Sequence, residues 1–266
     1  MTGDVGLGSD QERRQLALRL ASIAREAGEA ILEIYGAPGA VREKADHSPV
    51  TAADEAAERL ILARLEALSP KYPVVAEESV AAGRIPKVGN GPFWLVDPLD
   101  GTLEFVHRIG EFTVNIGLIE GGRPTLGVVY LPAQGKAYLG CGPGKAWRIA
   151  GSGAPQPIAA RPAPAEGLIA VASRSHRDAK TEAFLAEKNI KSWLPAGSAL
   201  KFCLIAEGAA DVYPRFGRTM EWDTAAGHAV LAAAGGRVHD LDGRELRYGK
   251  PDFANPAFIA EGRPAA

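Results

Sequence analysis

The sequence has few cysteines and no long apolar run, and both shortages exclude classes of protein. Only two of its 266 residues are cysteine, too few for a disulfide framework, so we expect a reducing compartment. Cys203 falls in an apolar helical pattern and is predicted to be a core residue, whereas Cys141 is assigned no role. No apolar stretch approaches the roughly 18 residues of a membrane-spanning helix, and no apolar signal segment is seen at the N-terminus. We therefore expect no integral membrane segment and a cytoplasmic location. Peripheral association with the inner membrane is compatible with this expectation.

The sequence also lacks an excess of positive charge. Its 30 basic residues stand against 32 acidic ones, which gives a formal net charge of −2 at pH 7. Nucleic-acid-binding domains concentrate positive charge, so no nucleic-acid partner is expected. An anionic substrate would have to be held by metal ions or by a local basic cluster. With 46% hydrophobic and 23% charged residues, the composition is typical of a soluble globular protein with a sizeable core.

The most informative segment reads Trp-Leu-Val-Asp-Pro-Leu-Asp-Gly-Thr and ends at Thr102. Its apolar run predicts a strand that carries Asp97 to its end, where Pro98 is expected to stop the sheet ladder. Asp100 follows in a tight turn beside Gly101, and Thr102 offers a hydroxyl group and a helix start. Two carboxylates on rigid strand support are what a hard cation such as Mg²⁺ binds. The same residues are also common turn residues, so this segment by itself supports both interpretations.

Four further acids stand at predicted element ends, where α/β sheets place their sites. Glu77 and Glu78 end a short predicted strand, and neighbouring strand residues point to opposite faces, so at most one of them can face a given site. Asp54 lies in the first turn of a helix predicted at about 52–68, where it fits a capping role or a role beside a cation or a water. Asp223 lies in the first turn of a helix rich in small residues. There it fits the role of a helix-dipole partner or that of a metal ligand.

The spacing of apolar residues predicts the order of the remaining elements. A helix is expected over 11–35, and residues 112–149 alternate apolar runs with turns, as in an antiparallel meander. A segment rich in glycine and proline at 150–166 is the expected boundary between two subdomains. Beyond it a βαβαβ order predicts a partly parallel sheet. The predicted units are a metal-binding α+β subdomain at 1–160, with a disordered leader at 1–10, and a substrate-binding α/β subdomain at 161–266.

In order and spacing, three acidic motifs resemble those of the inositol monophosphatase superfamily of Mg²⁺-dependent, lithium-sensitive phosphatases. They are Glu77-Glu78-Ser79, the segment 97–102, and Trp222-Asp223-Thr-Ala-Ala-Gly. Five other segments resemble the CysQ-type 3′(2′),5′-bisphosphate nucleotidases of that superfamily: 44–54, 110–116, 173–176, 197–203 and 211–217. The segment 78–83 is more similar to the inositol monophosphatases. The resemblance runs from about residue 12 onward and implies a mixed α/β fold. That fold is a layered αβαβα sandwich with an antiparallel sheet in the first half and a partly parallel sheet in the second.

The resemblance also implies a set of site residues. Two to three Mg²⁺ ions are expected on Glu77, Asp97, the backbone carbonyl of Leu99, Asp100 and Asp223. The implied catalytic residues are Glu77 together with a pair, Asp54 and Thr102, that orients the attacking water and accepts its proton. The implied substrate contacts are Leu99, Asp100, Gly101, Thr102, His176, Ser198, Lys201, Arg215 and Asp223. The alternatives for the cationic residues are a structural His176, a solvated Lys201 and an ion-paired Arg215.

Together these residues predict hydrolysis of the 3′-phosphate of adenosine 3′,5′-bisphosphate, giving AMP and phosphate by attack of a metal-activated water. The partner is then a small phosphorylated nucleotide, and the resemblance also allows a homodimer. Two alternatives stay open. One is an inositol or sugar-phosphate phosphatase, favoured by the segment 78–83, and the other is a catalytically silent binding protein of the same fold.

Overall fold

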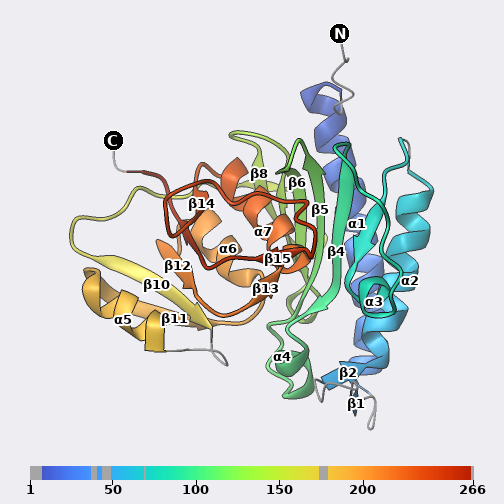
Figure 1. Cartoon of the computed structure of the whole chain (residues 1–266), viewed down its shortest axis with the longest axis horizontal. Coiled ribbons are helices and arrows are strands. Elements are labelled where there is room, and N and C mark those ends of the chain that lie inside the picture. The colour runs from blue at the N-terminus through green and yellow to red at the C-terminus, as the bar shows by residue number, and fades with distance from the viewer. Residues whose placement is uncertain (1–7, 37–40, 44–48, 69, 174–178, 265–266) are drawn as a thin grey trace.

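Two sheets and the helices around them form five layers (Figure 1). The computed structural model describes residues 8–36, 41–43, 49–68, 70–173 and 179–264. The layers run as follows: helices α1 (Asp10–Tyr35) and α2 (Ala52–Glu66), a seven-stranded sheet, helices α6 (Leu200–Ala206) and α7 (Glu221–Ala233), a five-stranded sheet, and helix α5 (Ala179–Glu187). The expected αβαβα sandwich is confirmed.

The first sheet follows chain order. Its strands are β3 (Val74–Ala76), β4 (Phe93–Asp100), β5 (Thr113–Glu120), β6 (Arg123–Leu131), β7 (Lys136–Gly140), β8 (Ala146–Ala150) and β9 (Gln156–Pro157). Only β3 and β4 pair in parallel, and the other neighbours are antiparallel, so the predicted meander is confirmed. A 3-10 helix (Pro132–Gln134) joins β6 to β7, and the short helices α3 (Glu77–Ala81) and α4 (Thr102–Val106) follow β3 and β4.

The second sheet is partly parallel, as predicted. Its spatial order is β11 (Ile190–Ala196), β10 (Leu168–Ser173), β12 (Val212–Arg215), β16 (Phe258–Glu261) and β14 (Arg237–Asp240). The first three strands pair in parallel, whereas β16 runs antiparallel to both of its neighbours. Parallel strands end at the same edge, so β11 and β12 deliver Ala196 and Arg215 to one side of the sheet. Two small ribbons complete the described strands: β1 (Val41–Glu43) with β2 (Pro49–Thr51), and β13 (Thr219–Met220) with β15 (Ala254–Asn255).

Helix α1 covers nearly the range that the apolar pattern predicts. Helix α1 begins at Asp10 because Ser9 and Glu12 cap it reciprocally: each side chain bonds the backbone N–H of the other. Ser9 and Asp10, assigned to the leader, therefore belong to the helix start.

Cys203 is fully buried in α6, as predicted, and both cysteines are free. Among the described residues no helix has the length and apolar character needed to cross a membrane.

Helix α7 comes from the second half of the sequence but packs on the sheet of the first half (Figure 1). Glycines on β5, β6 and β7 face it. A Cβ atom added at Gly140 would lie 2.7 Å from the carbonyl oxygen of Ala229 and 2.7 Å from the Cα of Val230. The absence of side chains on these glycines thus lets the α7 backbone lie directly against the strands, and this contact fixes where the first turn of α7 is placed.

Replacing Gly140 with alanine should lower the free energy of unfolding by about 1–3 kcal/mol, because the added methyl group meets backbone atoms that cannot rotate away. Denaturant unfolding of the purified protein measures this change. Gly91→Ala is the matched control, since a Cβ there would meet no atom within 4 Å. Equal unfolding curves for the two variants would contradict the close seating of α7.

Candidate active site

Strand β4 carries two of the predicted carboxylates and continues past its expected end. The prediction that Pro98 stops the ladder is wrong, because β4 extends to Asp100. The register shifts on the way: Asp97 lies opposite Asn115, and Asp100 lies opposite Thr113, so β4 has one residue more than β5 in this interval. Proline, which has no N–H to donate, is tolerated at such a bulge. Residues three apart on a regular strand point to opposite faces, and the extra residue reverses this for Asp97 and Asp100.

Five carboxylates meet around Asp97. Its side chain is buried, and its pKa is raised well above the ordinary value, first by burial and then by the negative charges of Glu77, Asp100, Asp223 and Asp54. Each neighbour lies at the end of β4 or in the first turn of α2, α3 or α7. The structure therefore brings together the acids predicted as metal ligands and the acid predicted to be the proton acceptor.

The three aspartates each turn one oxygen toward a donor of the protein. Asp97 Oδ1 accepts from the Leu99 N–H (3.1 Å), Asp100 Oδ2 from the Ala199 N–H (2.7 Å) and Asn115 Nδ2 (3.4 Å), and Asp223 Oδ2 from the Met220 N–H (2.8 Å). These bonds orient every carboxylate through one of its two oxygens.

The chemistry of this donor set fits a hard divalent cation. All of the side-chain donors are carboxylate oxygens, the type that Mg²⁺ binds, and added positive charge would offset the repulsion that raises the pKa of Asp97. The side chains are not drawn in to ligand distance: in the part of the chain that the structure describes, no three His, Cys, Asp or Glu side chains are placed to hold one metal ion together. Mutual repulsion favours this spread, and a cation would oppose it.

Glu77 and Glu78 lie in the first turn of helix α3 and do not end a strand, so the expected strand alternation does not separate them. They differ for another reason. Glu77 acts on Asp97, whereas the backbone N–H of Glu78 donates to Glu58 Oε2 (2.8 Å) and Ser79 Oγ donates to Glu58 Oε1 (2.6 Å). Glu58 is buried in α2 and anchors α3, a role that the sequence prediction missed. The available signal was an acid on the apolar face of a predicted helix.

The turn between β11 and α6 lies against the turn after β4. A Cβ atom on Gly101, whose φ is +90°, would lie 2.5 Å from Ser198 Oγ, so only glycine fits there. Ser198 also has a positive φ, and its hydroxyl donates to the backbone carbonyl of Glu111. The side chain of Glu111 accepts from the Gly197 N–H at 2.9 Å. Glu111 thus supports the predicted substrate residue Ser198, a role that the sequence analysis did not assign, although Glu111 lies in the family-like segment 110–116.

Two cations stand beside the acidic cluster. Lys201 is buried, and burial lowers its pKa to about 8, although the charge of Asp100 acts in the opposite direction. Its ammonium group donates to the carbonyl of Ser198 at 2.7 Å, so the alternative of a solvated lysine is wrong. Arg215 ends β12, and its charge partly offsets the rise in the pKa of Asp223 that burial and the charge of Asp100 cause. Its Nε is buried and has no hydrogen-bond partner among the described residues.

Three predicted residues have no contact here that tests their role. Thr102 begins α4 directly after Gly101, and its pairing with Asp54 stays a prediction. Leu99 is buried and contributes the N–H that holds Asp97, while metal binding by its carbonyl stays a prediction. His176 lies outside the described residues.

Comparison with known proteins identifies the class. Residues 12–265 match the inositol monophosphatase family, and the chain belongs to that family. Within it, the chain is 47% identical over 243 residues to the protein named 3′(2′),5′-bisphosphate nucleotidase CysQ of Escherichia coli K12, covering 90% of this chain and 97% of the relative. The predicted resemblance to CysQ-type proteins is confirmed.

Solved structures agree with this placement. The crystal structure of CysQ from Bacteroides thetaiotaomicron, described as a bacterial member of the inositol monophosphatase family, has a TM-score of 0.80 and 40% identity, and the match covers 94% of this chain and 97% of that one. An inositol monophosphatase (IMPase) of Thermotoga maritima has a TM-score of 0.75 and 25% identity, with 93% and 92% covered.

The pKa of Asp223 predicts how stability depends on pH. Burial and the charge of Asp100 raise that pKa from 3.8 to about 7, so between these values the folded state binds a proton that the unfolded state does not. Stability is therefore lost as the pH rises through this window. The buried His228, whose pKa burial lowers from 6.5 to about 3, acts in the opposite direction below about pH 6.5. The melting temperature of metal-free protein should therefore fall from about pH 6.5 to about pH 8, and Mg²⁺ should raise it more at the higher pH.

Asp223→Asn should flatten the fall with pH and reduce the stabilisation by Mg²⁺. The exposed acid Asp242, which pairs with Arg244 on the surface, provides the control variant Asp242→Asn, for which both effects should match those of the wild type. Thermal unfolding at a series of pH values, with and without Mg²⁺, measures them. A melting temperature that rises steadily over the same range would contradict the charge repulsion described here.

Proposed function

We propose that the protein is a Mg²⁺-dependent phosphomonoesterase that hydrolyses the 3′-phosphate of adenosine 3′,5′-bisphosphate to AMP and phosphate. The observation that carries the proposal is the placement of Lys201 and Arg215 beside the five-carboxylate cluster. Acids alone would suit any phosphomonoester. A second, cationic subsite suits a substrate that keeps one phosphate while losing another. The names of the CysQ relatives support the same activity. The proposed reaction takes place in the cytoplasm.

The metal ligands in this proposal are Glu77, Asp97, the Leu99 carbonyl, Asp100 and Asp223, which would hold two to three Mg²⁺ ions. Bound Mg²⁺ supplies a water of lowered pKa and positive charge for the attacking and leaving oxygens. The protein's own part is to keep the carboxylates oriented. The bonds from the backbone N–H groups of Leu99, Ala199 and Met220 do this before any ion is bound.

The catalytic residues act on the water and on the phosphate that leaves. Thr102 and Asp54 orient the attacking water, and the Asp54 carboxylate takes its proton as the oxygen attacks phosphorus. The P–O bond to the ribose 3′ oxygen breaks, and that oxygen takes a proton from solvent water to become the free hydroxyl of AMP, while Asp54 returns its proton to the solvent. Gly101, which has no side chain, lets the backbone at 101–102 come close to the phosphate.

The retained 5′-phosphate and the nucleoside occupy the second half of the site in this proposal, on His176, Ser198, Lys201 and Arg215. The unpaired Nε of Arg215 offers a donor that a phosphate oxygen would satisfy. Lys201 carries its positive charge below a pKa of about 8, so it is cationic at neutral pH.

An inositol or sugar-phosphate phosphatase is the second candidate, favoured by the segment 78–83. The structure gives that segment a different task, because the backbone of Glu78 and the hydroxyl of Ser79 bind Glu58. Its sequence thus reflects how α3 is anchored, and this weakens it as an argument about substrate. A catalytically silent protein is disfavoured because every predicted metal acid is present.

Glu77 and Glu78 provide a matched pair of variants for the metal site. Glu77→Gln should lower kcat by about two orders of magnitude or more, because it removes a metal ligand. Glu78→Gln should change kcat less than about threefold, since the backbone N–H of Glu78, which binds Glu58, is retained. Steady-state phosphate release at saturating Mg²⁺ measures both. Equal losses in the two variants would mean that the wrong acid has been assigned to the metal.

Phosphate release from adenosine 3′,5′-bisphosphate, inositol 1-phosphate and fructose 1,6-bisphosphate tests the substrate. The bisphosphate nucleotide should be preferred, and Lys201→Met and Arg215→Met should each raise its KM about 10- to 100-fold, the usual effect of losing a hydrogen bond to a charged group. The activity of the two variants on inositol 1-phosphate should stay close to that of the wild type. A wild-type preference for inositol 1-phosphate would overturn the cationic subsite and leave the metal site intact.

A further inference from the structure

We propose that Glu221, Lys250 and Asn255 are positioning residues for Asp223: they clamp the start of α7 so that its carboxylate is held ready for Mg²⁺. The inference rests on the proposed function, in which Asp223 is a metal ligand. None of the three residues touches the metal cluster itself in the contacts described above. Their effect on Asp223 passes through the backbone of Met220, the residue that caps α7.

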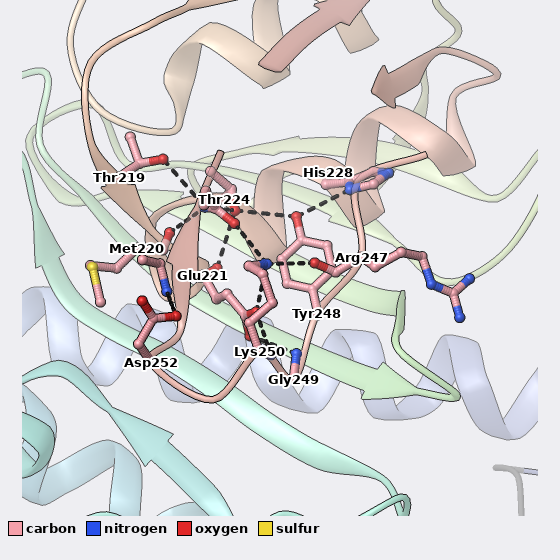
Figure 2. A network of polar contacts seen from close by, with 12 residues as sticks. Thr219, Met220, Glu221, Thr224, His228, Arg247, Tyr248, Gly249, Lys250 and Asp252 are labelled. Atoms are coloured by element: carbon pink, nitrogen blue, oxygen red, sulfur yellow. Dashed lines mark hydrogen bonds and ion pairs between the residues drawn. The ribbon is translucent and has the colours of Figure 1, made fainter. Parts of the chain in front are cut away.

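Glu221 is the first residue of α7 and has no exposed surface. Figure 2 shows it beside Gly249 and Lys250. Its carboxylate accepts from the backbone N–H groups of Gly249 (2.8 Å) and Lys250 (3.0 Å), and the Lys250 ammonium group lies 2.7 Å from Oε1. Its own N–H donates to the carbonyl of Phe253 at 2.7 Å. Four polar contacts thus bind the first residue of the helix to the segment 249–253, which is far away in the sequence.

Asn255 holds the residue before it. Its side-chain amide donates to the carbonyl of Met220 (2.7 Å) and to Thr224 Oγ1 (3.0 Å). The N–H of Met220 in turn donates to Asp223 Oδ2 at 2.8 Å. Asp223 is therefore two hydrogen bonds away from Asn255, and the position of its carboxylate depends on where the Met220 peptide groups are held.

The clamp does more than cap a helix. One side-chain oxygen is the usual cap of a helix start. Here a half-buried ion pair holds Glu221, and the short ribbon between β13 and β15 holds Met220. Phe253, within the clamp, is buried with a φ of +53°, a strained conformation for a side chain of this size that the surrounding contacts must maintain. Strain and burial of this kind are typical of segments that hold a functional group in place. Outer-shell contacts that orient metal ligands commonly contribute 10- to 100-fold, roughly, in metal affinity.

Glu221→Gln tests the clamp, because it removes the charge that holds Lys250 and keeps the size of the side chain. We expect Mg²⁺ affinity, measured by isothermal titration of the substrate-free protein, to fall about tenfold. The Mg²⁺ concentration that gives half of the full thermal stabilisation should rise by the same factor. At saturating Mg²⁺, kcat should return to within about threefold of the wild type and KM for the nucleotide should be unchanged, since the catalytic and substrate residues are untouched.

Asp211→Asn is the matched control. Asp211 is also a buried carboxylate that accepts a backbone N–H, from Ile169 at 2.7 Å, and bonds a basic side chain, Arg161, at 2.7 and 2.9 Å. It lies just before β12 and makes none of the clamp's contacts. This variant should lose stability as Glu221→Gln does, while its Mg²⁺ affinity stays that of the wild type. Equal losses of Mg²⁺ affinity in both variants would show a general effect of instability and overturn the inference.

Asn255→Ala is the second route, and it carries the test if Glu221→Gln does not fold. It removes the bonds from the Asn255 amide to Met220, Thr224 and Thr219 and the bond that Asn255 Oδ1 accepts from Lys250. The ion pair of Lys250 with Glu221 stays in place, and Mg²⁺ binding should also weaken about tenfold. Wild-type Mg²⁺ affinity in Asn255→Ala and in any folded Glu221→Gln would overturn the positioning role and leave the proposed function standing. If the wild type itself neither binds Mg²⁺ nor releases phosphate, the proposed function fails, and the inference fails with it.

Discussion

Repulsion between buried carboxylates is the constraint on which the rest of this structure depends. Asp97 has almost no exposed surface, yet four other acids act on it. Such a cluster costs stability in the folded state, because burial and like charge both oppose ionisation. Two large apolar cores, one on each face of the seven-stranded sheet, offset this loss of stability. A site that is unfavourable without a cation is also one that binds a cation strongly, since the ion relieves the repulsion.

Holding like charges together requires rigid supports, and four of the five acids have one that the structure shows directly. The bulge at Pro98 brings Asp97 and Asp100 to a common side, and glycines on the sheet let α7 approach closely enough to present Asp223. Glu58 anchors the helix that carries Glu77. The supports come from strands, helix starts and a buried side chain, so no single loop movement would disperse the cluster.

The cationic side of the site has the opposite electrostatic problem. Burial opposes the positive charge of Lys201, and the neighbouring Asp100 offsets part of this cost. The acids lie at the end of β4 and at the starts of α2, α3 and α7, whereas the cations lie on α6 and β12. The turn after β4 touches the turn before α6 at Gly101 and Ser198. In the proposed function, this contact joins the metal ligands on β4 to the substrate residues at the start of α6.

The sequence by itself determined the longer helices, the meander, the partly parallel second sheet and the motifs around Asp97 and Asp223, because these follow from local periodicity and from turn residues. Only the tertiary structure decided that Pro98 sits within a bulge, that Glu111 supports the turn at Ser198, and that Glu221 is clamped from a distant segment. The physical reason is separation along the chain: the bond from Ser198 to Glu111 spans 87 residues. Such partners are set by how the layers pack, and no local propensity encodes them.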